Sequence, residues 1–131
     1  MSRQHILVVD DQPENLRLVR HLLESFKYSV LTALNAEEAL EQVRRSPPDL
    51  ILMDVQLPGI SGLELTARIK ADPLTRSIPV VAVTASDSKN LEANAKAAGC
   101  AAVVAKPIDG RALPKTIARL LSRDGKKKRR P

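Results

Sequence analysis

Five short runs of apolar residues, separated by longer segments with helical spacing, constrain the fold of this chain more than any other feature. The runs are continuous rather than alternating, which is typical of parallel strands covered by helices on both faces. Repeated strand–helix units of this kind predict one α/β domain with a doubly wound, five-stranded parallel sheet and five helices. The expected strands are residues 6–9, 29–33, 50–53, 80–83 and 102–105.

Three helix starts carry chemical signals as well as periodicity. Pro13 suits the first turn of a helix, and apolar residues follow it at helical spacing. Ser61 with Glu64, and Asn35 with Glu38, have the spacing of a capping box, in which the side chain of the first residue accepts a backbone N–H of the new helix. These pairs place the second and third helices.

The last two helices are predicted from their ends. An Ala-rich helix over 89–98 is expected to stop at Gly99, because glycine readily adopts the backbone conformation that ends a helix. A fifth helix is expected from near residue 109 to residue 122. Pro114 has no N–H, so this helix should start late or bend near its beginning.

Charge divides the 131-residue chain into two parts. The net charge is +6, and residues 123–131 contain six Lys or Arg and one Asp, which supply +5 of it. The rest is nearly balanced, so the sequence predicts a folded domain over residues 1–122 and a basic, disordered tail over 123–131. No basic-then-apolar leader and no apolar run near 18 residues is seen, and a cytoplasmic location is expected. The single Cys100 is expected to be a small buried residue.

Polar residues follow four of the predicted strands. Asp10 and Asp11 come after the first, Asp54 after the third, Thr84 after the fourth and Lys106 after the fifth. Each alone has an ordinary alternative, since Asp is common in turns and Lys is usually solvated. Together they should meet, because ligands of parallel α/β sheets bind beyond the carboxyl ends of the strands.

Three converging carboxylates favour a hard cation. Their mutual repulsion would raise the pKa of at least one of them unless a positive ion were bound. Mg²⁺ prefers a few carboxylates together with the oxygens of a phosphate. Lys106 and the Thr84 hydroxyl can donate to phosphoryl oxygens, and Asp54 can act as the covalent nucleophile. The cluster therefore predicts a phosphoryl-transfer site.

At these motifs the chain resembles the receiver domains of two-component response regulators. The resemblance spans residues 4–122 and is carried by Val9-Asp10-Asp11, by Met53-Asp54-Val55-Gln56-Leu57-Pro58-Gly59 with Ser61-Gly62, by Val83-Thr84-Ala85 and by Lys106-Pro107. It implies the flavodoxin-like strand order 2-1-3-4-5 of CheY-like proteins. The stretch around Asp54 looks most like the stand-alone receivers of bacterial cell-cycle and phosphorelay circuits.

The resemblance also implies a role for each site residue. Asp54 receives a phosphoryl group from a histidine kinase or a histidine phosphotransfer protein. Asp11, Asp54 and the backbone carbonyl of Gln56 bind Mg²⁺ directly, and Asp10 helps through water. Thr84 and Lys106 contact the phosphoryl group, and the peptide bond between Lys106 and Pro107 is expected to be cis. The chain would be a signalling domain that assists its own phosphorylation and dephosphorylation, and not a turnover enzyme.

The sequence departs from the family at Val103, where these domains normally carry an aromatic residue. In the family, phosphorylation usually alters the face formed by the fourth helix, fifth strand and fifth helix, and downstream proteins bind this face. The receiver domain itself is expected to act as a monomer or as a phosphorylation-dependent dimer. Without the aromatic residue the usual side-chain readout cannot operate. Gln56 and Ser86 lie at positions that tune aspartyl phosphate hydrolysis in relatives, although ordinary polar loop residues remain an alternative.

Other functions fit the residues less well. A Mg²⁺-dependent phosphohydrolase with an aspartyl nucleophile would need a second Asp where the chain has Gln56. A flavin binder would need a phosphate-cradling loop, whereas the loop after the first strand is acidic. The basic tail is expected to act as a solubilising segment, although it could touch an anionic membrane or an acidic partner. It has no aromatic residues for stacking, so nucleic acid is not expected. His5 and His21 are expected to be structural or surface residues.

Overall fold

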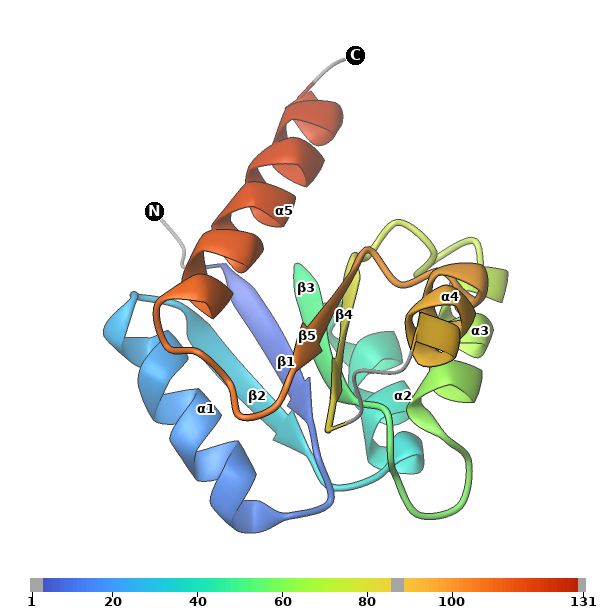
Figure 1. The fold of residues 1–131 in the computed structure, drawn as a ribbon. Coiled ribbons are helices and arrows are strands. Elements are labelled where there is room, and N and C mark those ends of the chain that lie inside the picture. The colour runs from blue at the N-terminus through green and yellow to red at the C-terminus, as the bar shows by residue number, and fades with distance from the viewer. Residues whose placement is uncertain (1–3, 86–88, 130–131) are drawn as a thin grey trace.

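The predicted strands form one parallel sheet in the order β2-β1-β3-β4-β5. In the computed structural model, residues 4–85 and 89–129 are described, with Lys89 and residues 123–129 described by their backbone only. The elements are β1 (His5–Val9), α1 (Pro13–Ser25), β2 (Ser29–Ala33), α2 (Ala36–Arg45), β3 (Leu50–Asp54), α3 (Gly62–Ala71), β4 (Val80–Thr84), α4 (Lys89–Ala98), β5 (Ala102–Ala105) and α5 (Ala112–Arg129). The predicted fold class is thereby confirmed (Figure 1).

Helices cover both faces of the sheet, as the continuous apolar runs predicted (Figure 1). In β3, Leu50 and Leu52 pack against the residues of α1 and α5, while Ile51 and Met53 pack against α2, α3 and α4. All four side chains are at most 1% exposed. Successive residues of a strand point to opposite faces of the sheet. A strand that is buried on both faces therefore carries apolar residues at successive positions.

The capping interactions predicted for the second and third helices are present. The Asn35 side chain accepts the N–H of Glu38 at 2.9 Å, and the Glu38 carboxylate accepts the N–H of Leu34 at 3.0 Å. At the start of α3, Ser61 Oγ accepts the N–H of Glu64 at 3.2 Å. These bonds satisfy backbone donors that have no partner within a helix.

The predicted ends of α4 and the start of α5 are also confirmed. Gly99 follows α4 with φ +109, a backbone conformation that residues with a side chain rarely adopt. The first helical residue of α5 is Ala112, which places Pro114 within the first turn, where its missing N–H costs no helical hydrogen bond. The helix therefore starts late, as Pro114 predicted.

The end of α5 differs from the prediction. The helix continues to Arg129, so the predicted end of the fifth helix at residue 122 is wrong. Lys and Arg are good helix formers, and extending an existing helix avoids the unfavourable first turn. Residues 130–131 of the predicted tail lie outside the described residues. Within the described chain, no helix has the length and apolar character needed to cross a bilayer.

Strand register brings the polar residues to one edge. Val9 lies beside Met53 in the β1–β3 pair, and Asp54 lies beside Val83 in the β3–β4 pair. Thr84 lies beside Ala105 in the last pair. The residues that end these strands or follow them directly are therefore neighbours.

Candidate functional site

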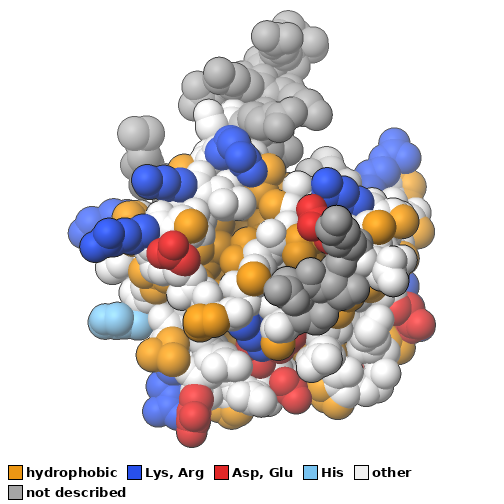
Figure 2. Space-filling view, viewed as in Figure 1, with side chains coloured by type: hydrophobic (Ala, Val, Ile, Leu, Met, Phe, Trp, Pro, Cys, Tyr) orange, Lys and Arg blue, Asp and Glu red, His pale blue; other side chains and the backbone are white. Residues whose placement is uncertain are grey.

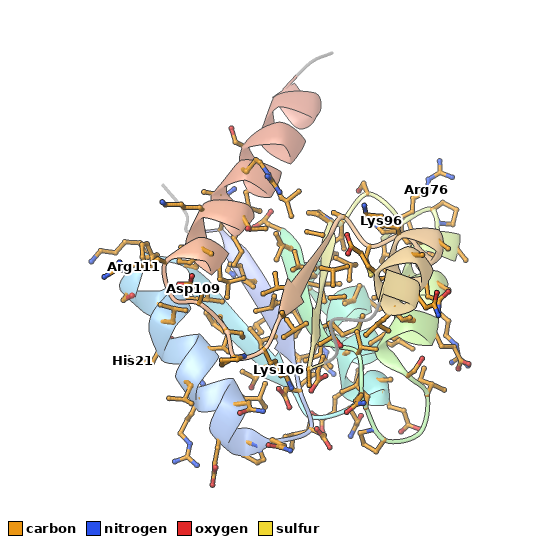
Figure 3. All side chains as sticks on the ribbon, in the orientation of Figure 1. His21, Arg76, Lys96, Lys106, Asp109 and Arg111 are labelled. Atoms are coloured by element: carbon orange, nitrogen blue, oxygen red, sulfur yellow. The ribbon has the colours of Figure 1, made fainter. Side chains whose placement is uncertain are left out.

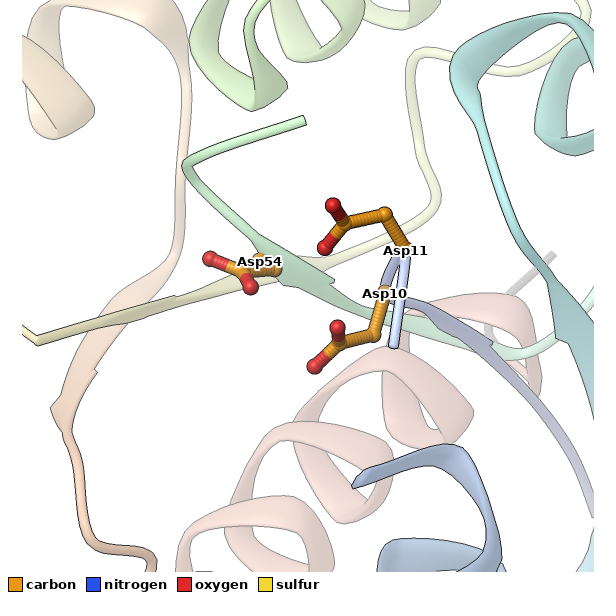
Figure 4. A group of neighbouring side chains, drawn as sticks. All are labelled: Asp10, Asp11 and Asp54. Atoms are coloured by element: carbon orange, nitrogen blue, oxygen red, sulfur yellow. The ribbon is translucent and has the colours of Figure 1, made fainter. Parts of the chain in front are cut away.

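Three aspartates meet at the carboxyl edge of the sheet (Figure 4). Asp10 and Asp11 follow β1, and Asp54 is the last residue of β3. One carboxylate oxygen from each lies within 4.8 Å of the other two. Asp10 and Asp54 are buried, at 6% and 7% exposure, whereas Asp11 is exposed. The site is thus an acidic cluster of two buried carboxylates and one that is exposed to solvent.

Backbone N–H groups fix the orientation of the two buried carboxylates. The N–H of Gln12 donates to Asp10 Oδ1 at 2.9 Å, and the N–H of Gln56 donates to Asp54 Oδ1 at 3.0 Å. In both cases the donor lies two residues after the aspartate, the local bond typical of Asp in turns. The second oxygen of each carboxylate remains directed at the shared site.

Lys106 supplies the positive charge of the site. Its Nζ lies 2.9 Å from Asp54 Oδ2 and 4.0 Å from Asp10 Oδ2. Burial acts to lower the pKa of Lys106, but the hydrogen bond to Asp54 and the charges of the three aspartates outweigh it, so the pKa is raised. Lys106 is therefore a permanent cation here. It follows β5 at the strand-end edge (Figure 3), and the Lys106–Pro107 bond is cis, as predicted.

The acidic cluster has more negative charge than Lys106 can balance. Burial raises the pKa of Asp10, and the nearby Asp54 charge adds to the rise, while the Gln12 N–H, Lys106 and Asn15 act in the opposite direction. A raised carboxyl pKa means that nearby hydrogen-bond donors and cations do not fully offset the cost of the negative charge. Hard oxygen donors with this residual charge fit Mg²⁺, which Asp10, Asp11 and Asp54 could hold between them.

Replacing Asp10 with asparagine is expected to stabilise the metal-free protein at neutral pH. Burial raises the folded-state pKa of Asp10 above its usual value, so its charge disfavours folding at pH 7. This cost disappears as the pH falls through the folded-state pKa and then through the unfolded-state pKa. The asparagine oxygen can still accept the Gln12 N–H. Urea denaturation from pH 7 to pH 3 should show a higher midpoint for Asp10→Asn only at the upper end. A constant difference across this range would contradict the electrostatic explanation.

Thr84 and Gln56 lie where the sequence placed them. Thr84 is the last residue of β4, is 4% exposed and neighbours the strand that ends in Asp54. Gln56 reaches Asp54 through its N–H, while a metal-binding role for its carbonyl stays a prediction. Ser86 lies outside the described residues.

Gly62 is a site residue whose role the sequence analysis missed. A Cβ at this position would lie 2.4 Å from the backbone oxygen of Asp54 and 2.9 Å from the Cα of Val55. The N–H of Gly62 donates to the Val55 carbonyl at 2.8 Å. A glycine directly after the capping Ser61 was the available signal, because glycine is a poor helix former with no reason to stand there otherwise. It lets α3 begin against the end of β3.

A groove beside the acidic cluster was also missed. It has a volume of about 650 Å³ and lies between α1 and the segment that follows β5. Its lining combines polar groups of the site with apolar side chains: Asp10, Asn15, Leu18, Val19, Leu22, Lys106, Pro107 and Ile108. Leu18 is 71% exposed. No sequence signal could have found the groove, because its walls come from segments about 90 residues apart.

Comparisons with known proteins agree with this geometry. The response regulator receiver domain profile matches residues 6–118. The polar-differentiation response regulator DivK of Brucella anthropi is 45% identical over 103 residues, which cover 79% of this chain and 84% of DivK. DivK of Brucella ovis is 44% identical over the same length.

Solved structures give the same family. A CheY-like receiver domain from Methanospirillum hungatei is 29% identical, with a TM-score of 0.89, and the match covers 96% of this chain and 99% of that one. CheY4 of Vibrio cholerae is 28% identical, with a TM-score of 0.86, covering 91% of this chain and 99% of that one. With the parallel sheet and the edge cluster of three aspartates and a lysine, these matches show that the chain belongs to the response regulator receiver domain family.

Proposed function

We propose that this protein is a single-domain response regulator that accepts a phosphoryl group on Asp54 from a histidine kinase or a histidine phosphotransfer protein, with Mg²⁺. The observation that carries the proposal is the position of the Asp54 carboxylate, with Lys106 at 2.9 Å on one side and two further carboxylates on the other. The DivK relatives are response regulators by name. The protein would work as a cytoplasmic signalling domain.

The proposed reaction forms a bond between an Asp54 carboxylate oxygen and phosphorus. The phosphorus–nitrogen bond of the donor phosphohistidine breaks, and its electron pair returns to the imidazole nitrogen. The Gln56 N–H and Lys106 hold the carboxylate in place, and Lys106 and Thr84 are proposed to donate to the phosphoryl oxygens. When held by Asp11, Asp54 and the Gln56 carbonyl, with Asp10 helping through water, Mg²⁺ would neutralise charge on the nucleophile and the phosphoryl group.

The groove beside the cluster supports docking of the phosphohistidine donor. It opens next to Asp10 and Lys106 and presents the largely exposed Leu18. Exposed apolar area next to a reactive group is typical of a protein-binding surface. The donor would cover Leu18 and bring its imidazole to the cluster of three aspartates.

The output of the protein is proposed to pass through α4, β5 and α5. Val103 is half-buried and packs against the core on the α4 side, so no aromatic side chain is available there to change position. Among its described side chains, α4 fully buries only Ala95, and the partly buried Leu91 also packs against the core. A helix with so small an apolar anchor costs little to move. We therefore propose that phosphorylation is read through α4, in the monomer or in a phosphorylation-dependent dimer.

Phosphorylation by a small phosphodonor tests the proposed function. Incubation with acetyl phosphate and Mg²⁺ should raise the protein mass by one phosphoryl group, and EDTA should prevent it, because the three aspartates need a cation before the nucleophile meets an anionic donor. Borohydride reduction of the acyl phosphate and peptide mass spectrometry should mark Asp54. Incorporation that survives EDTA, or that maps to another residue, would reject the assignment.

A further inference from the structure

The positive charge of the protein belongs to the whole of α5 and not to its last residues alone. Residues 111–131 contain nine Lys or Arg and one Asp, a net charge of +8. Residues 1–110 contain 12 Lys or Arg and 14 Asp or Glu, a net charge of −2, so the two parts together give the +6 of the chain. The charge of the chain is therefore unevenly distributed, with the positive charge concentrated in the segment that contains α5.

Within the part whose side chains are described, three cations lie on the solvent side of α5 or directly before its first residue. Arg111, Lys115 and Arg119 are exposed and stand four residues apart, close to the helical repeat. The opposite side of the helix packs against the sheet through Leu113, Ile117, Leu120 and Leu121. Figure 2 shows Lys and Arg side chains gathered beside this part of the helix.

In the part of the chain whose side chains are described, these cations have no acidic partner, unlike several other basic residues of the surface. Elsewhere, four cations pair with a glutamate one turn away on the same helix: Arg20 with Glu24, Arg45 with Glu41, Arg68 with Glu64 and Lys96 with Glu92. Within the described residues, none of Arg111, Lys115 and Arg119 forms an ion pair. Residues 112–122 contain no Asp or Glu that could supply one. The charge of α5 is thus available to an external anion.

The helix carries this charge away from the phosphoacceptor edge. α5 starts after Lys106, runs back along the sheet and extends beyond it to Arg129 (Figures 1 and 3). Its 18 residues correspond to about 27 Å. In the sequence, Arg123 and Lys127 continue the four-residue spacing of Arg119, and residues 126–130 are five consecutive cations. A ligand of α5 could therefore bind while Asp54 stays accessible.

We propose that the exposed cations Arg111, Lys115 and Arg119, together with the basic sequence that follows them in the chain, bind the phosphate backbone of double-stranded DNA. An α-helix about 10–12 Å wide fits the major groove, which has phosphates on both sides. Residues 122–131 contain no apolar or aromatic residue that could enter a bilayer or stack on a single strand.

This proposal reverses the expectation from the sequence that nucleic acid is not a partner. That expectation treated residues 123–131 as a separate disordered tail on a neutral domain. The backbone of α5, which continues to Arg129, joins residues 123–129 to the three cations of the folded part. Binding would be independent of base sequence, because phosphate contacts carry no sequence information.

The dependence of DNA affinity on salt provides the test. Fluorescence polarisation with a short labelled duplex would be measured for the wild type and for the triple variant Arg111→Gln/Lys115→Gln/Arg119→Gln. Each phosphate contact adds about 0.9 to the slope of log affinity against log salt, so the variant should lose about 2.7 of slope. The matched control Arg17→Gln/Arg44→Gln/Arg76→Gln removes the same charge from exposed positions elsewhere and should keep the wild-type slope.

Two further measurements make the outcome decisive. Deletion of residues 123–131 should weaken duplex binding relative to the wild type but leave acetyl phosphate labelling of Asp54 unchanged. Duplex binding thus tests this proposal, and labelling tests the proposed function separately. Vesicles of phosphatidylserine and phosphatidylcholine provide the membrane alternative. Equal slopes for the two triple variants, the absence of duplex binding by the wild type, or binding to vesicles but not to the duplex would each overturn the proposal.

Discussion

Asp54→Asn is expected to abolish phosphoryl incorporation while the protein remains folded. An amide nitrogen and a neutral amide oxygen cannot replace the carboxylate as nucleophile, yet the side chain keeps the shape and an oxygen that can accept the Gln56 N–H. Binding of the phosphoryl analogue beryllofluoride, titrated with Mg²⁺ and followed by NMR, gives a readout that does not require phosphoryl transfer. Wild-type shifts should cluster at Asp11, Thr84 and Lys106.

The control for this experiment is Asp72→Asn. Asp72 lies at the end of α3, and its Oδ1 accepts the N–H of Leu74 at 2.9 Å, a bond that asparagine can also make. This variant should respond to beryllofluoride and to acetyl phosphate as the wild type does. Equal NMR responses in the wild type and in Asp54→Asn would show that the ligand binds somewhere other than at Asp54.

Gly62→Ala is expected to have the second largest effect, although Gly62 contributes no functional group. The added methyl would lie 2.4 Å from the backbone oxygen of Asp54 and 2.9 Å from the Cα of Val55, and neither backbone atom can move without displacing the end of β3. Overpacking of this kind costs about 1–3 kcal/mol of stability. Because Asp54 itself would shift, phosphorylation should slow by up to about 100-fold, the effect of a misplacement near 1 Å.

Gly110→Ala is the matched control for the glycine experiment. The nearest atom to an added Cβ there is Leu22 Cδ1 at 3.7 Å, which is ordinary van der Waals contact. Urea denaturation and the rate of acetyl phosphate labelling should place this variant close to the wild type. If the two alanine variants lost similar stability and rate, the close approach of α3 to β3 would not be what requires glycine.

The strands, the helix starts and the members of the acidic cluster could be predicted from local sequence. A strand buried on both faces must be apolar at every position, and Asn35 and Ser61 cap helices through bonds that reach only three residues along the chain. Once the sheet is parallel, its carboxyl edge must collect Asp10, Asp54 and Lys106, because strand ends point the same way. The members of the acidic cluster could therefore be predicted from the sequence.

Tertiary structure alone decided how these parts meet. It showed that Lys106 hydrogen-bonds Asp54 at 2.9 Å but lies 4.0 Å from Asp10, that Gly62 leaves no space for a side chain, and that α5 carries its charge on one continuous helix. The first two facts depend on distances between segments far apart in the chain. The third depends on where α5 ends, which no local sequence signal marks. Local periodicity encodes which residues face the core and which end a strand, whereas close contacts follow from how the packed elements fill space together.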